Sequence, residues 1–135
     1  MRKLLLLISV TLWVLPVIAG ETAAPVERTV EGEILDLGCY TSRLASGAEH
    51  RSCAARCLSR GNPAGLLSDD GAVYTIAGSS PAFEPYAAER VRITGSTRGT
   101  LLLAKTMQVW TDGAWQEVAM TDFGAPEKLE GEAGE

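Results

Sequence analysis

The stretch RTVEGEILDL, residues 28–37, alternates small or apolar residues with polar ones. Val30, Gly32 and Ile34 fall on one face of an extended chain, while the residues between them, such as Glu31, fall on the other. A period of two is typical of a strand with one buried and one solvent-facing side. We therefore expect the first strand of the fold at residues 28–37.

Further strand patterns follow this one along the chain. Two apolar runs flank the sequence Ser68-Asp69-Asp70-Gly71, which predicts a hairpin because Gly71 tolerates positive φ and the acidic residues accept local hydrogen bonds. A short helical pattern with two aromatic residues covers 81–89. The remaining strands are expected at residues 65–67, 72–76, 90–95, 101–110 and 115–118.

These patterns predict a mainly β fold. Five or six short strands punctuated by glycine, with a short helical piece among them, favour a small, partly open barrel of the OB type. A two-layer sandwich is the alternative architecture. Because a fold does not determine a function, the OB-like prediction by itself implies no oligonucleotide binding.

A helical pattern lies between the first strand and the hairpin. Ser46 and Glu49 have the spacing of a capping box and Gly61 supplies a stop, so one helix is expected over residues 46–60. The fold prediction therefore includes a cysteine-bearing helix inserted after the first strand. One face of this helix carries His50, Cys53, Ala54, Cys57 and Leu58.

The N-terminus has the composition of a targeting segment. Arg2 and Lys3 precede an apolar run that ends at Pro16, which is the pattern of a signal peptide over residues 1–20. That run is short for a bilayer span, so we expect a periplasmic or secreted protein with no stable membrane span after cleavage. The expected order after the signal peptide is a polar lead-in (21–27), one β-rich domain (28–121) and an acidic disordered tail (122–135).

The protein is acidic. The chain has 12 basic and 17 acidic residues, a net charge of −5, and removal of residues 1–20 with Arg2 and Lys3 makes it −7. Nucleic-acid binders carry an excess of lysine and arginine that contacts the phosphate backbone. The charge therefore argues against nucleic acid as a partner.

The sequence contains three cysteines, Cys39, Cys53 and Cys57. Exported proteins meet oxidising conditions, and an odd number leaves at least one thiol outside any intramolecular disulfide. Residues four apart on a helix have Cβ atoms about 5–6 Å apart, whereas a disulfide needs about 3.5–4.5 Å. A disulfide would therefore join Cys39 to Cys53 or Cys57, and burial of the thiols as small apolar side chains is another alternative.

Metal binding is the function we favour for these cysteines. Cys53 and Cys57 share a helix face on which both can bind one ion, and Cys39 can approach from the end of the first strand. Thiolate sulfur selects zinc or copper(I). His50 is an optional fourth ligand, because in a helix that begins at Ser46 it lies about 10.5 Å from Cys57 along the axis.

Thiolate catalysis, with His50 as the base for Cys53, is a further alternative. The sequence has no Cys-x-x-Cys pair and no second histidine to orient the first. We therefore predict no catalytic residues and a non-enzymatic metal-binding domain. A disulfide-stapled accessory or protein-interaction domain of the periplasm is the alternative function, followed by a thiol-based redox protein.

Two other charged features have simpler interpretations. The run Asp69-Asp70-Gly71 matches part of a calcium loop, but the glutamate expected further on is missing and the hairpin turn explains these residues. Arginines cluster near the cysteines, either as a solvated helix face or as a docking surface for an acidic protein partner. They are Arg43, Arg51, Arg56 and Arg60.

Four motifs run through the expected domain. They are Gly32-x-Ile34-x-Asp36-x-x-Cys39, His50-x-x-Cys53-x-x-x-Cys57, Gly71-x-Val73-Tyr74-x-Ile76-x-Gly78 and Val91-x-Ile93-x-Gly95. The pattern resembles a family of small exported bacterial proteins of uncharacterised function, in which a leader peptide precedes an OB-like β domain. The similarity covers roughly residues 28–110. It implies that Cys39, His50, Cys53 and Cys57 belong to one site, and it supplies neither a ligand nor a reaction.

Overall fold

The computed structural model describes residues 24–122 and 124–127. Within these residues six strands form one sheet in the order β3-β2-β1-β4-β5-β6, and a parallel pairing of β3 with β5 closes the first five into a barrel. The predicted mainly β, OB-like barrel is therefore confirmed, although it is closed rather than partly open. The strands are β1 (Val26–Asp36), β2 (Ala64–Ser68), β3 (Val73–Ile76), β4 (Arg90–Arg98), β5 (Leu101–Thr111) and β6 (Ala114–Val118).

Strand β1 lies at the centre of the sheet, where it pairs with β2 on one side and β4 on the other. It begins at Val26, inside the predicted lead-in. Val30, Gly32 and Ile34 are buried, as the alternating pattern predicts. Only glycine fits at position 32, because a Cβ there would collide with the backbone oxygen of Leu67 on β2.

Apolar side chains from strands β1 to β5 fill the interior of the barrel. Ile34, Leu66 and Met107 are 0 % exposed. The segment between β3 and β4 is a 3₁₀-helix, η2 (Ser80–Tyr86), shorter than the predicted helical piece, and its Phe83 is fully buried in the same core. These contacts make the barrel a continuous apolar core rather than a channel.

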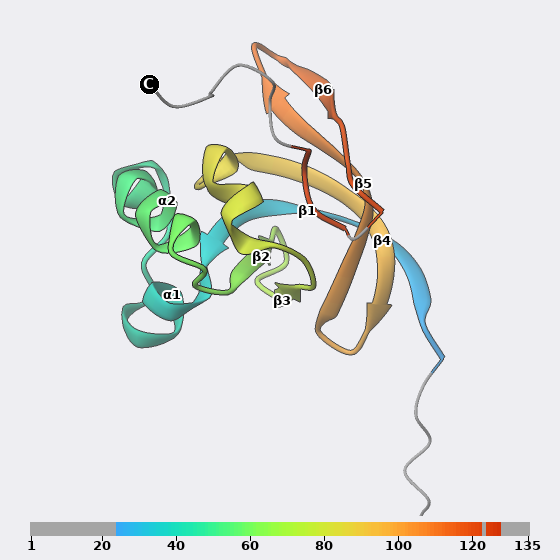
Figure 1. The fold of residues 1–135 in the computed structure, drawn as a ribbon, viewed down its shortest axis with the longest axis horizontal. Helices are drawn as coiled ribbons and strands as arrows, with labels where there is room; N and C mark the ends of the chain where they lie inside the picture. The colour runs from blue at the N-terminus through green and yellow to red at the C-terminus, as the bar shows by residue number, and fades with distance from the viewer. Residues whose placement is uncertain (1–23, 123, 128–135) are drawn as a thin grey trace, which may run out of the picture.

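The segment between β1 and β2 differs from its prediction. A first helix, α1 (Leu37–Arg43), follows β1 directly and was not predicted. The single helix predicted over 46–60 is instead a 3₁₀ turn, η1 (Ala48–His50), followed by α2 (Arg51–Ser59). Figure 1 shows α1 and α2 together at one end of the barrel, next to the end of β1.

The predicted capping box does not form. Gly47 takes the N-cap position with a φ of 82°, and no side chain caps η1. The Gly47 amide donates to the Glu33 carboxylate on β1 at 2.6 Å, so a contact with the barrel replaces the local bond expected between Ser46 and Glu49. The helix proper therefore starts after His50.

The described chain after β6 folds back onto the barrel. Met120 bridges Pro126, and Ala125 is 4 % exposed. The disordered tail predicted from residue 122 therefore differs from the structure at 124–127. The predicted signal peptide at 1–20 and the tail residues 128–135 lie outside the described residues.

No described helix is long and apolar enough to cross a membrane.

Candidate metal centre

The first cysteine is fixed by the junction of β1 and α1. Asp36, the last residue of β1, is fully buried and is the N-cap of α1. Its carboxylate accepts hydrogen bonds from the backbone amides of Gly38 at 3.1 Å and Cys39 at 2.8 Å. Because an aspartate at the N-cap satisfies amides that have no partner within the helix, it sets the first turn. Cys39 therefore sits in the first turn of α1, directly beside the barrel.

The other cysteines are placed by the packing of α2. Ala54 and Leu58 are buried in the core, so the helix face that contains them is turned to the barrel and to η2. Cys53 and Cys57 immediately precede these residues and are partly buried at the edge of that face. The Arg51 guanidinium pairs with Glu89 and so fastens the start of α2 to the barrel.

The structure brings all four predicted residues to one place. Among the described residues, ligand atoms of Cys39, His50 and Cys53 lie within 4.8 Å of one another. A second group, also within 4.8 Å, consists of Asp36, Cys39 and Cys57. Cys39 belongs to both groups and is the centre of the cluster.

His50 has a more central place than the sequence predicted. Its predicted distance from Cys57 assumed a helix from Ser46, whereas α2 starts at Arg51 and leaves His50 in the preceding 3₁₀ turn. The imidazole therefore joins Cys39 and Cys53, while Cys57 belongs to the second group.

The His50 ring has an unusual environment. Its Nε2 atom is buried and has no hydrogen-bond partner, and no other buried side-chain nitrogen or oxygen in the described part of the chain is in this state. Buried polar atoms are nearly always hydrogen-bonded, and an unpartnered one costs about 1–3 kcal/mol. The residue that carries this unpartnered nitrogen is the same one whose imidazole is grouped with the thiols of Cys39 and Cys53.

Charges of both signs surround the Cys39 sulfur. Arg43 Nη2 lies 3.2 Å from the Cys39 Sγ and 3.9 Å from the Cys53 Sγ. The Asp36 carboxylate, through its hydrogen bond with the thiol, and burial together raise the pKa of Cys39 to about 11, against the opposite effect of Arg43. The thiol is therefore protonated at neutral pH, and a metal ion has to displace that proton.

The carboxylate itself stays ionised. Burial raises the pKa of Asp36, but hydrogen bonds from the Cys39 thiol and amide, and then from Asn62 and Gly38, outweigh burial and hold the pKa below its ordinary value. A buried anion thus persists behind the thiol of Cys39.

The donor set suits a soft ion. All three cysteines have free thiols in this structure. Two sulfurs and an imidazole nitrogen are the ligand types of zinc and copper sites in proteins. Asp36 and Arg43 lie beside them, and the sequence patterns predicted neither the helix cap at Asp36 nor the contacts of Arg43 with the sulfurs. The signal for Asp36 was its residue type near the end of the predicted strand, because aspartate is a preferred N-cap residue.

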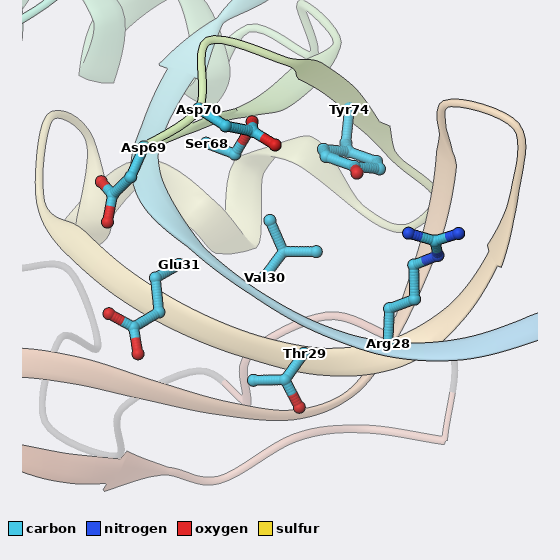
Figure 2. Close-up of a pocket in the computed structure, with 8 residues that line it drawn as sticks. All are labelled: Arg28, Thr29, Val30, Glu31, Ser68, Asp69, Asp70 and Tyr74. Atoms are coloured by element: carbon cyan, nitrogen blue, oxygen red, sulfur yellow. The ribbon is translucent and has the colours of Figure 1, made fainter.

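A separate pocket of about 420 Å³ lies between β1 and the β2–β3 turn. Figure 2 shows Arg28 and Tyr74 at one end and the acidic turn residues at the other. Asp69 is paired with Arg90 at 2.6 Å, and Asp70 accepts from the Ala72 amide at 3.1 Å, so both serve the hairpin. None of the cysteines lines this pocket.

Comparisons with protein-family models, curated proteins and solved structures find no match to this chain.

Proposed function

We propose that this protein is an exported, non-enzymatic domain that binds one zinc or copper(I) ion. Cys39, His50 and Cys53 are the primary ligands, and Cys57 is a further one. The observation that carries the proposal is the buried Nε2 atom of His50, which lacks a hydrogen-bond partner and belongs to a residue grouped with two thiols. An ion at this position would supply the missing partner.

The dimensions of the group support an ion of this kind. A tetrahedral ion that binds sulfur at about 2.3 Å and nitrogen at about 2.0–2.1 Å holds its ligand atoms about 3.5–4 Å apart. The three ligand atoms lie within 4.8 Å in the present structure. They therefore need to approach one another by at most about 1 Å, which is within the range of side-chain rotation.

Arg43 supports binding by thiolates. Two deprotonated cysteines bring two negative charges to the edge of the barrel, next to the Asp36 carboxylate. The Arg43 guanidinium lies within reach of both sulfurs, at 3.2 and 3.9 Å. Hydrogen bonds to charged sulfur are stronger than those to a neutral thiol, so Arg43 favours the metal-bound form.

The environment of Cys39 argues against this residue as a catalytic nucleophile. A catalytic cysteine has a lowered pKa, whereas the pKa of Cys39 is raised to about 11 because of the hydrogen bond with Asp36 and burial. The apolar N-terminal run is the support for export.

Competitive titration tests this proposal. The whole chain is reduced, and Zn²⁺ or Cu(I) is then added against a chromophoric chelator that reports free metal. We expect one equivalent to bind, with loss of most of the affinity in Cys39→Ser and His50→Ala. Glu49→Gln is the matched control, because Glu49 is an exposed acid on the same turn and belongs to neither group.

Thiol counting separates metal binding from a disulfide. The chain recovered from an oxidising compartment is denatured without reductant, and its free thiols and metal content are measured. Three thiols with one zinc or copper support the proposal. One free thiol without metal contradicts it and indicates a disulfide between Cys39 and Cys53 or Cys57.

A further inference from the structure

Asp36 is the one fully buried acidic side chain in the described part of the chain. Burial of a charge is costly unless hydrogen bonds satisfy it. It also belongs to the sequence motif Asp36-x-x-Cys39, and the ligand set of the proposed function does not account for it. The cost of burying this carboxylate therefore calls for a specific role.

Its hydrogen bonds join two segments. Oδ1 accepts from the Gly38 amide at 3.1 Å and from the Asn62 side-chain amide at 3.2 Å, and Oδ2 accepts from the Cys39 amide at 2.8 Å. Asn62 in turn donates its backbone N–H to the Cys57 carbonyl at 3.0 Å. The carboxylate therefore connects the start of α1, which carries Cys39, with the end of α2, which carries Cys53 and Cys57.

We propose that Asp36 and Asn62 are positioning residues of the metal site, which hold the Cys39 sulfur in the orientation that the ion requires. This inference rests on the proposed function. Side chains that hydrogen-bond behind a metal ligand fix its orientation, and their loss typically costs 10–100-fold in metal affinity.

The geometry favours this role for Asp36 over direct binding to the ion. Three N–H groups already occupy its two oxygens, so binding to a metal would require it to give up bonds inside the barrel junction. Gly38 permits the arrangement, because a Cβ there would lie 3.3 Å from both the Asn62 amide nitrogen and the Asp36 Oδ1. Zinc and copper(I) also prefer sulfur and imidazole to a carboxylate.

Two substitutions test the proposal in the whole chain. Asp36→Ser keeps a good N-cap residue and therefore the start of α1, but it removes the carboxylate that reaches Asn62. Asn62→Ala removes one donor and leaves the carboxylate in place. Asp70→Asn is the matched control, because Asp70 also accepts a backbone amide, that of Ala72, but lies in the β2–β3 turn.

We expect Asp36→Ser to lower Zn²⁺ affinity by roughly 10–100-fold. Asn62→Ala should lower it by about 2- to 10-fold, since one hydrogen bond is lost. Asp70→Asn should leave it unchanged. In the Co²⁺-loaded chain, the sulfur-to-cobalt charge-transfer bands should shift in both test variants and not in the control, which separates orientation of the sulfur from a loss of stability.

Circular dichroism and urea unfolding establish whether each variant is folded. If Asp36→Ser does not fold, Asn62→Ala alone decides the test. Affinities within twofold of the parent, with unchanged cobalt bands, would show that Asp36 is only a helix cap. A zinc X-ray absorption spectrum that loses an oxygen neighbour in Asp36→Ser would show a direct ligand instead. If the parent chain binds no zinc, the proposed function itself fails, and this inference fails with it.

Discussion

The barrel and the helical segment between β1 and β2 are held together by different forces. In the barrel, strands pair along most of their length and fully buried side chains such as Ile34 and Leu66 fill the interior. In the helical segment, α1 buries no residue and α2 buries only Ala54 and Leu58. The hydrogen bonds of Asp36 position α1, and the packing of Ala54 and Leu58 positions α2. The barrel therefore contains most of the apolar core, and the inserted segment carries the cysteines and the histidine of the candidate site.

We expect the largest effect on stability from a substitution in the barrel core. Leu66 is 0 % exposed and packs in the centre of the core. Leu66→Ala should reduce the free energy of unfolding by about 2–5 kcal/mol, because it removes buried apolar volume and leaves a cavity. Urea unfolding followed by circular dichroism measures it. A loss below about 1 kcal/mol would mean that the core is not packed as described.

Substitution of Cys39 should affect metal binding without affecting the stability of the barrel. Cys39 belongs to both ligand groups but contributes nothing to the barrel core. Cys39→Ser should lower zinc affinity by roughly 100-fold or more, because it removes a sulfur ligand, whereas loss of a residue that hydrogen-bonds behind a ligand costs about 10–100-fold. The urea midpoint of the metal-free chain should stay close to that of the parent. Thr41→Ala, an exposed change on the same helix, is the control. Equal loss of affinity in both variants would contradict the assignment.

Substitution of His50 should have opposite effects on the stability of the metal-free chain and on zinc binding. Its buried Nε2 has no partner, so the metal-free chain bears a cost of about 1–3 kcal/mol. His50→Leu removes that polar atom and should leave metal-free stability equal to the parent or higher, while zinc no longer stabilises the fold. Thermal unfolding with and without zinc measures both effects. A less stable metal-free variant would indicate that the imidazole has a structural partner.

Arg43 should have a smaller effect. The guanidinium contacts the sulfurs of Cys39 and Cys53 at the surface, where water and salt weaken charge interactions. Arg43→Gln should reduce zinc affinity by about 3- to 10-fold, consistent with one hydrogen bond to a charged group. The difference from the parent should shrink as salt rises. Arg56→Gln, an exposed arginine on α2, is the control and should change little.

The smallest effect concerns acid stability at the β2–β3 turn. Hydrogen bonds from the Ser68 hydroxyl and the Ala72 amide hold the pKa of Asp70 below its ordinary value of 3.8. Because the folded pKa is depressed, the contribution of Asp70 is present above pH 3.8 and is lost as pH falls through the folded pKa. Urea unfolding should show Asp70→Asn slightly less stable at pH 6 and equal to the parent at the acidic end. A constant difference would contradict this.

The strands were predictable because alternation along the sequence reports burial directly. The pattern at Val30, Gly32 and Ile34 required no knowledge of the partner strands, and the turn glycines Gly71 and Gly113 marked two of the hairpins. Closure of the barrel was not predictable in this way. It depends on the parallel pairing of β3 with β5, between residues far apart in sequence.

The helical segment was predicted less well because long-range contacts decide its shape. The spacing of Ser46 and Glu49 is that of a capping box, but Glu33 on β1 takes the Gly47 amide. Helix α1 is only seven residues long and contains Gly38, so its own sequence pattern is faint. The structure shows instead that its N-cap lies at the end of a strand.

The candidate ligands were predictable from residue type, and their arrangement was not. An odd number of thiols in a chain that we expect to be exported predicted a shared centre at Cys39, Cys53 and Cys57. The place of His50 depended on where α2 begins. Arg43 and Cys39 lie four residues apart on α1, but the contact of Arg43 with the Cys53 sulfur joins different helices, and spacing within one helix carries no information on it.

The nitrogen resonances of the single histidine provide the most direct test of the metal centre. Because His50 is the sole histidine in the chain, a long-range proton–nitrogen spectrum of the imidazole needs no assignment. With one equivalent of Zn²⁺ we predict that the Nε2 resonance moves to the position of a metal-bound nitrogen, in step with the loss of three reactive thiols. Zinc binding that leaves the Nε2 resonance unchanged would contradict the account.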